Sequence, residues 1–134
     1  MKRRVSREIA FKLVFESFFV DFRKKEEIEN FSEKQNVKLS EYSKKLVIGV
    51  IEKREDLDKK INLYLKNWEF ERISKIIISI LEIAFYEIIY VKDVDFPIAI
   101  NEAVELAKKF FGNEGPSFVN GVLGSFVKDL KNLN

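Results

Sequence analysis

The stretch from Pro97 to Gly124 constrains the fold of this chain more than any other. Its apolar residues recur at helical spacing in two segments, and a proline stands in the first turn of each segment. Gly112 ends the first segment, and the residues after it have the composition of a turn. We therefore expect two helices, joined by a short turn, that pack against each other. Their apolar positions are Ile100, Ala103, Val104, Ala107 and Phe111, then Val119, Val122, Leu123, Phe126, Val127 and Leu130.

Helical spacing also dominates the residues before Pro97, and apolar alternation at period two never persists. The expected fold class is therefore all-α: a compact bundle of about seven helices in one domain, residues 1–134, with N-terminal helices packed on a C-terminal helical group. In chain order, the other expected elements are a helix from Arg3 to Phe22, a short helix and loop over residues 23–39, a helix capped by Ser40 that runs toward Trp68 and bends or breaks near Arg54 to Asp58, and a mostly buried helix from Phe70 to Val91.

The composition excludes much of enzyme chemistry. The chain has no cysteine and no histidine, so disulfides, thiolate and imidazole ligands and the usual general base near neutral pH are absent. No nucleotide-binding or nucleophile motif occurs, and no acidic cluster has metal-loop spacing. We predict no catalytic residue, no cofactor and no metal site. The longest uncharged run near the middle, Ile76 to Leu81, is too short to span a bilayer, and nothing resembles a signal peptide, so we expect a cytoplasmic protein with no membrane partner.

Positive charge gathers at the N-terminal end. The net charge of the chain is only +2, but residues 1–25 hold eight basic and three acidic side chains, a net of +5, which leaves −3 for the remainder. Arginines near a helix end can pair with phosphate and stack on unpaired bases. This distribution is compatible with RNA binding, and equally with a solvated helix start.

Three side chains stand apart from the helical patterns. Asn120 and Gly121 are poor helix formers inside an apolar helix. Gly121 would let another helix approach closely, while Asn120 would bond backbone across that contact or touch RNA. Phe118 lies about 100° from the centre of its apolar stripe, so it is either an exposed stacking platform or an edge-of-core residue. Glu87 borders an isoleucine-rich face and is expected to reach solvent, the alternative being a partner donor.

Several of these motifs resemble one family. The string AINEAVELAKKF, the glycine turn and FVNGVL resemble the C-terminal signature of the NusB family of transcription antitermination factors. The opening RRVSREIAFKLVF resembles the basic start and first helix of that family, and ILEIAFYEI resembles its central helix. The resemblance spans nearly the whole chain, although residues 23–66 match only in pattern.

The resemblance implies a NusB-like fold and a non-enzymatic factor of the transcription elongation complex. Such a factor binds boxA RNA in ribosomal RNA operons and pairs with a small-subunit ribosomal protein, known in that role as NusE. By position, the resemblance assigns RNA binding to Arg3, Arg4, Arg7 and Phe118. Asn120 is a further candidate for RNA contact because of its unusual place inside an apolar helix. It assigns contact with the ribosomal protein to Phe15 and Glu87.

We further expect Phe15 and Glu87 to lie side by side and form one docking patch, because both stand at the edges of their helices' apolar arcs. The alternative function is a helical protein–protein interaction module without specific RNA binding. An apolar first helix also makes a homodimer plausible.

Overall fold

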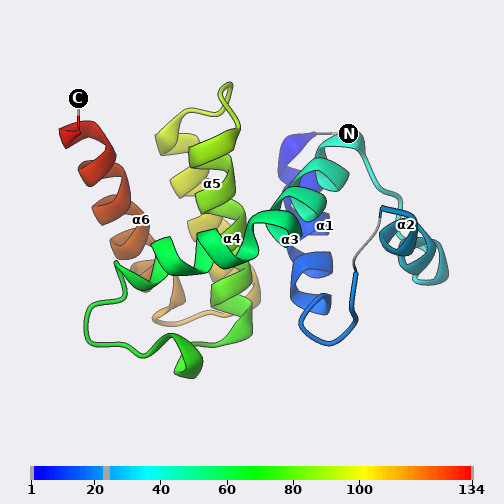
Figure 1. Ribbon diagram of the computed structural model, residues 1–134, viewed down its shortest axis with the longest axis horizontal. Coiled ribbons are helices and arrows are strands. Elements are labelled where there is room, and N and C mark those ends of the chain that lie inside the picture. Colours follow the sequence, from blue (N-terminus) through cyan, green and yellow to red (C-terminus); the bar gives the residue numbers. More distant parts are fainter. Residues whose placement is uncertain (1, 23–24, 134) are drawn as a thin grey trace.

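A computed structural model describes residues 2–22 and 25–133, and helices dominate both ranges (Figure 1). The fold class is the all-α one predicted, with six α-helices and one 3₁₀ turn in the described ranges, a small difference from the expected count of about seven. Arg23 and Lys24, counted above in the positive N-terminal segment, lie outside the described residues. The elements are α1 (Arg3–Glu16), α2 (Lys25–Lys34), α3 (Glu41–Asn62), the 3₁₀ turn η1 (Phe70–Arg72), α4 (Lys75–Tyr90), α5 (Phe96–Phe110) and α6 (Gly115–Asn132).

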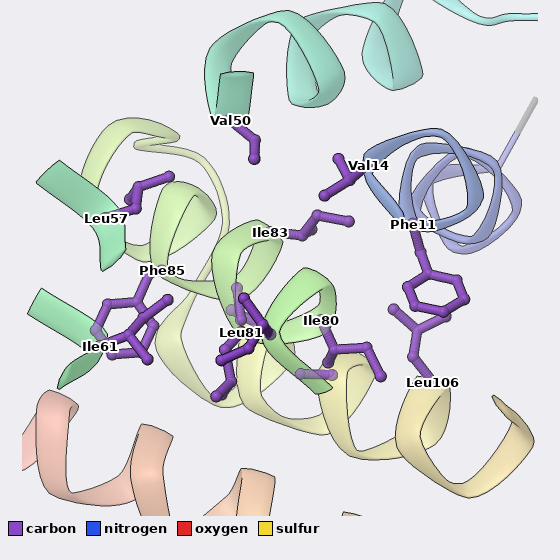
Figure 2. Close-up of a cluster of buried hydrophobic side chains, with 14 of the residues drawn as sticks. Phe11, Val14, Val50, Leu57, Ile61, Ile80, Leu81, Ile83, Phe85 and Leu106 are labelled. Atoms are coloured by element: carbon purple, nitrogen blue, oxygen red, sulfur yellow. The ribbon is translucent and has the colours of Figure 1, made fainter. Parts of the chain in front are cut away.

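Helix α4 lies at the centre of the molecule and contacts α1, α3, α5 and α6. In Figure 1, α5 and α6 stand on one side of the molecule, α1 and α2 on the other, and α3 crosses between the two sides. The central place of α4 follows from its sequence, since an isoleucine-rich helix must be covered on most sides. Figure 2 shows the core side chains that meet around α4, among them Phe11, Val14, Val50, Leu57, Ile61, Ile80, Leu81, Ile83, Phe85 and Leu106.

The C-terminal helix pair forms as predicted. Helices α5 and α6 pack against each other, and the chain turns between them at Gly112, whose φ of +82° is a left-handed conformation that glycine adopts without strain. The Gly112 N–H donates to the Ala107 carbonyl at 2.8 Å, which closes the end of α5. Pro116 stands in the first turn of α6, where its missing N–H has no partner to lose.

Three predicted helices are shorter than their apolar patterns suggested, and one of them, α3, ends at Asn62 instead of running toward Trp68. Helix α1 ends at Glu16 rather than Phe22, because residues 17–19 form a turn and the Ser17 hydroxyl accepts a 2.8 Å hydrogen bond from Arg54. Helix α4 begins at Lys75 rather than at Phe70. The Ser74 hydroxyl caps it by accepting from the Ile76 N–H at 3.1 Å, and a separate 3₁₀ turn precedes it.

The capping role predicted for Ser40 is confirmed by a reciprocal bond with Ser43 at the start of α3. No break occurs near Arg54 to Asp58, since α3 runs as one continuous helix to Asn62. The charges in that segment are compatible with a continuous helix, because Arg54 points inward and its Nε donates to buried Glu82 at 3.0 Å. Burial, and then the hydrogen bond with Asp58, raise the pKa of Glu82.

Candidate nucleic-acid interface

Two arginines in the first turn of α1 are exposed and paired. Arg4 binds Glu102 of α5 with two donors, Nε at 3.1 Å and Nη2 at 2.8 Å from the same oxygen, Oε2. Arg3 donates to Asp93 at 2.9 Å, and its guanidinium carbon lies 4.3 Å from the centre of the Tyr42 ring. Side chains on α3, α5 and the loop before α5 therefore fix the direction of both guanidinium groups.

Arg7, the third predicted RNA contact, is buried. Its Nε lies 2.9 Å from both carboxylate oxygens of Glu87, and its Nη1 donates to Glu102 at 3.2 Å. Only 4% of Arg7 is exposed, so in this structure it holds carboxylates rather than facing solvent. The arrangement makes Arg7 the connection between α1, α4 and α5.

Glu87 does not reach solvent, and the prediction that it would is wrong. It is 1% exposed and accepts from Arg7 and from the hydroxyl of Tyr42, which means that the alternative of a partner donor is the observed one. Burial and then the hydrogen bond to Glu87 raise the pKa of Tyr42 well above its ordinary value of 10.0. The buried Arg7–Glu87–Tyr42 cluster is thus a structural unit that ties together α1, α3 and α4.

A charged groove of about 410 Å³ runs beside these arginines, between α1 and α5. Its lining residues include four cations and three carboxylates, and each exposed cation in it is paired. The pairs are Arg4 with Glu102 at 2.8 Å, Lys109 with Glu8 at 2.8 Å, and Lys108 with Glu105 at 3.3 Å. The groove therefore carries dense charge of both signs.

An aromatic pocket of about 340 Å³ lies where η1, α4 and the start of α6 meet. Trp68 is 59% exposed, and its ring meets the Phe118 ring edge to face at 5.9 Å between centroids. Phe111 is also exposed, and Arg72 lines the same pocket. Exposed aromatic faces beside a guanidinium suit the stacking of unpaired bases.

Phe118 combines both interpretations that its sequence position allowed. It is partly buried against the hydrophobic core and at the same time lines the open aromatic pocket. Trp68 was missed as a site residue because its position continued the apolar stripe of the preceding helix. In the structure Trp68 stands beyond that helix, since α3 ends at Asn62 and Lys66 adopts a left-handed backbone with a φ of +56°.

Asn120 and Gly121 lie on the exposed face of α6. A side chain at Gly121 would meet no atom within 4 Å among the described residues, so the predicted close approach of another helix is wrong. The Asn120 side chain makes no hydrogen bond to any residue in the described ranges, and the bond to backbone predicted for it is likewise wrong. Its assignment to RNA stays a prediction.

Phe15 lies in a third place, an apolar groove of about 360 Å³ formed mainly by α1 with side chains of α2 and α5. Its ring packs against Phe11 at 6.5 Å and against Phe19 at 5.3 Å, and Phe19, which the sequence did not single out, is 68% exposed. Phe15 follows Arg7, the partner of Glu87, by eight residues, about 12 Å along α1. The predicted joint patch of Phe15 and buried Glu87 is therefore wrong, and Phe15 alone stays a predicted partner contact.

Residues 2–22 and 25–133 contain no helix long and apolar enough to cross a membrane. In the same part of the chain, no three His, Cys, Asp or Glu side chains gather in a way that could hold a metal ion.

The fold and its sites define a small all-helical protein with a paired arginine end and a separate exposed aromatic pocket. A sequence model of the NusB family matches residues 4–128. The transcription antitermination protein NusB of Clostridium novyi is 42% identical over 132 residues, which cover 96% of this chain and 99% of that protein. The chain belongs to the NusB family.

Solved structures agree with this assignment. NusB of T. maritima superposes with a TM-score of 0.82 at 28% identity, covering 96% of this chain and 92% of that one. A chain from the crystal structure of the antitermination factors NusB and NusE in complex with dsRNA superposes with a TM-score of 0.81 at 26% identity, covering 95% and 96%. The family's fold is therefore preserved along nearly the whole length.

Proposed function

We propose that residues 1–134 act as one RNA-binding domain of a transcription antitermination factor. The factor binds boxA-type single-stranded RNA together with the ribosomal protein NusE, in the transcription elongation complex of ribosomal RNA operons in the cytoplasm. Membership of the NusB family supports this function, as do a relative named as an antitermination protein and a similar chain solved with NusE and dsRNA. The proposed role is one of binding, without catalysis.

The observation that carries the RNA half is the exposed Trp68–Phe118 pair. An aromatic side chain that is exposed in the free protein can stack on an unpaired base, and such stacking contributes about 1–3 kcal/mol per base. Arg72 on the same pocket supplies a cation for phosphate or for stacking. Asn120, on the exposed face of the same helix as Phe118, is proposed as a further polar RNA contact.

Arg3 and Arg4 are proposed as the phosphate contacts. Both guanidinium groups are exposed, whereas buried Arg7 is proposed to act through them by holding the carboxylates of Glu87 and Glu102. Phosphate contacts position a nucleic acid without reading its sequence, so base preference is expected to come from contacts other than those of Arg3 and Arg4.

NusE is proposed to cover the groove of Phe15 and Phe19. Exposed aromatic side chains beside an apolar groove have the composition of a protein-docking anchor, and no carboxylate other than Glu16 lines this one. Glu87 would influence that surface only through the placement of α1. The same apolar surface could pair two copies of the chain, which sedimentation at two concentrations would detect as a rise in mass.

Titration with a short boxA-type RNA, and with an unrelated RNA of equal length at the same salt concentration, tests the proposal. We expect tighter binding of the boxA-type RNA and a further gain when NusE is present. Equal affinity for both RNAs, with NusE binding intact, would instead favour a helical protein–protein interaction module.

A further inference from the structure

We infer that Glu102 competes with RNA phosphate for Arg4, so that the free protein holds its cationic end in a self-neutralised state. The inference rests on the proposed RNA-binding function and adds a regulatory carboxylate to it. In the free protein, the exposed cations of the α1–α5 groove are all paired with carboxylates of the same groove. RNA that enters must therefore exchange partners with a carboxylate rather than fill an open cationic site.

Glu102 occupies the donors that a phosphate would need. The Nε and Nη2 groups of Arg4 form one edge of the guanidinium, and both point at Glu102. This two-donor edge is the geometry with which arginine binds a carboxylate or a phosphate. A phosphate that takes that edge has to displace the carboxylate, and a phosphate on the remaining donors lies close to a second negative charge.

Glu102 is held firmly enough to compete. Hydrogen bonding from Arg4, opposed in part by burial, lowers the pKa of Glu102, so the group is ionised at neutral pH. Only 12% of its side chain is exposed, and Arg7 provides a second cationic partner at 3.2 Å. When Arg4 leaves, Glu102 therefore keeps the buried Arg7, and the exchange strands no unpaired carboxylate. Arg7 is a positioning residue in this step, since it keeps the competitor in place.

Asp93 repeats the arrangement in a weaker form. It accepts from Arg3 at 2.9 Å, and Tyr42 under the Arg3 guanidinium fixes its direction. Asp93 is far more exposed than Glu102 and has Arg3 as its cationic partner, so water replaces its bond at lower cost. We expect it to be the lesser competitor.

The test compares Glu102→Gln with Glu105→Gln. Glu105 lies on the same helix, lines the same groove and pairs with Lys108 rather than Arg4. Both substitutions therefore remove one negative charge from the groove, but only Glu102→Gln removes the partner of Arg4. A surface pair of this kind changes an equilibrium constant by a factor of about 2 to 5. We expect Glu102→Gln to raise RNA affinity about threefold above Glu105→Gln. Its log affinity should also fall more steeply with log salt, by about 0.7 for one phosphate contact made without exchange.

A second matched pair protects the test against misfolding. Asp93→Asn should raise affinity about twofold over Asp95→Asn, because Asp95 caps α5 without a side-chain bond and asparagine caps equally well. Urea unfolding of all four variants identifies any that fail to fold. If one pair contains such a variant, the RNA affinities of the other pair decide whether the inference holds. An affinity of Glu102→Gln at or below that of Glu105→Gln, in folded protein, overturns the inference.

Both RNAs of the functional test are used, so that the two proposals fail separately. Competition for phosphate concerns the RNA backbone, and the ratio of the two variants should be the same for boxA-type and unrelated RNA. A raised ratio without boxA preference supports the inference and contradicts boxA recognition. A boxA preference with no raised ratio supports the proposed function and overturns the inference.

Discussion

The charged end of the molecule and its aromatic end both adjoin α5 but present opposite chemistry. At the charged end, Glu102 in the middle of α5 gathers Arg4 and Arg7 into paired charges, while at the aromatic end Phe111, just past the end of α5, joins Trp68 and Phe118 in an exposed aromatic pocket. Nine residues separate Glu102 from Phe111, about 14 Å along the helix. The charged end is already satisfied in the free protein, whereas the aromatic end has apolar surface that only a ligand can cover. Binding thus requires partner exchange at one end and simple burial at the other.

The difference also separates stability from binding. At the charged end, exposed Arg4 and buried Arg7 share one carboxylate, so substitutions there affect folding and RNA contact together. Trp68 makes its ring contact outside the core and stands beyond the end of α3, so its removal should leave folding almost unchanged. Four measurements test this division.

The largest effect is expected for Glu87→Ala. The substitution leaves the Arg7 guanidinium buried with only Glu102, and Tyr42 without its acceptor, so we expect a loss of about 3 kcal/mol in the free energy of unfolding. Urea denaturation measures it. Glu105→Ala, an exposed carboxylate, serves as control and should change the value by less than about 0.5 kcal/mol. A loss below 1 kcal/mol for Glu87→Ala would contradict the structural role of the cluster.

The second largest effect is expected for Trp68→Ala, and it should be on RNA binding rather than on stability. Loss of one stacking face should weaken RNA binding by about 1–3 kcal/mol while the unfolding midpoint stays nearly constant. Leu63→Ala provides the control, since Leu63 is also exposed and apolar but does not line the aromatic pocket. Equal RNA affinity of the two variants would remove Trp68 from the interface.

The sequence predicted what depends on local pattern. Proline in the first turn of each C-terminal helix and Gly112 between them were enough to place α5 and α6. Ser40 was recognised as a cap from its position, but Ser74 was not, because isoleucines before and after it continued the apolar pattern. The start of α4 was therefore not predicted, because its capping serine stood inside an apolar run.

The site was predictable only in part, because its pairs are distant in sequence. Arg7 meets Glu87 across 80 residues and Glu102 across 95, and helical periodicity carries no information on such contacts. Periodicity predicted Glu87 at the border of the apolar face of its helix. In the structure its side chain is buried, because Arg7 of α1 places a guanidinium beside it. Gly121 shows the reverse case, in which an unusual residue suggested packing and the helix face is open.

Removing Arg3 and Arg4 together should flatten the salt dependence of RNA binding. A phosphate contact on single-stranded RNA that displaces no carboxylate contributes about 0.7 to the slope of log affinity against log salt, so the double alanine variant should lose at most about 1.4, and less where phosphate exchanges with Glu102 or Asp93. Adding Arg7→Ala should change the slope no further, since Arg7 is buried, although it should lower stability. Trp68→Ala, in contrast, should leave the slope as it is. A further loss of about 0.7 on adding Arg7→Ala would show that Arg7 reaches phosphate.

The smallest effect is the part of the acid dependence of stability that Glu102 contributes at the charged end. The Arg4 hydrogen bond holds the pKa of Glu102 below its ordinary value of 4.5, so the folded state favours the ionised group. This stabilisation is present above pH 4.5 and is lost as the pH falls through the lowered pKa of the folded protein. Because the pair is partly solvated, the loss should stay below about 1 kcal/mol, and Glu102→Gln should abolish it in urea unfolding between pH 6 and pH 3. Trp68→Ala should keep the full acid response of the unsubstituted chain, because no part of that response arises at the aromatic pocket. An acid response in Glu102→Gln as large as in the unsubstituted chain would assign that response to other carboxylates and weaken the contrast between the charged end and the aromatic end.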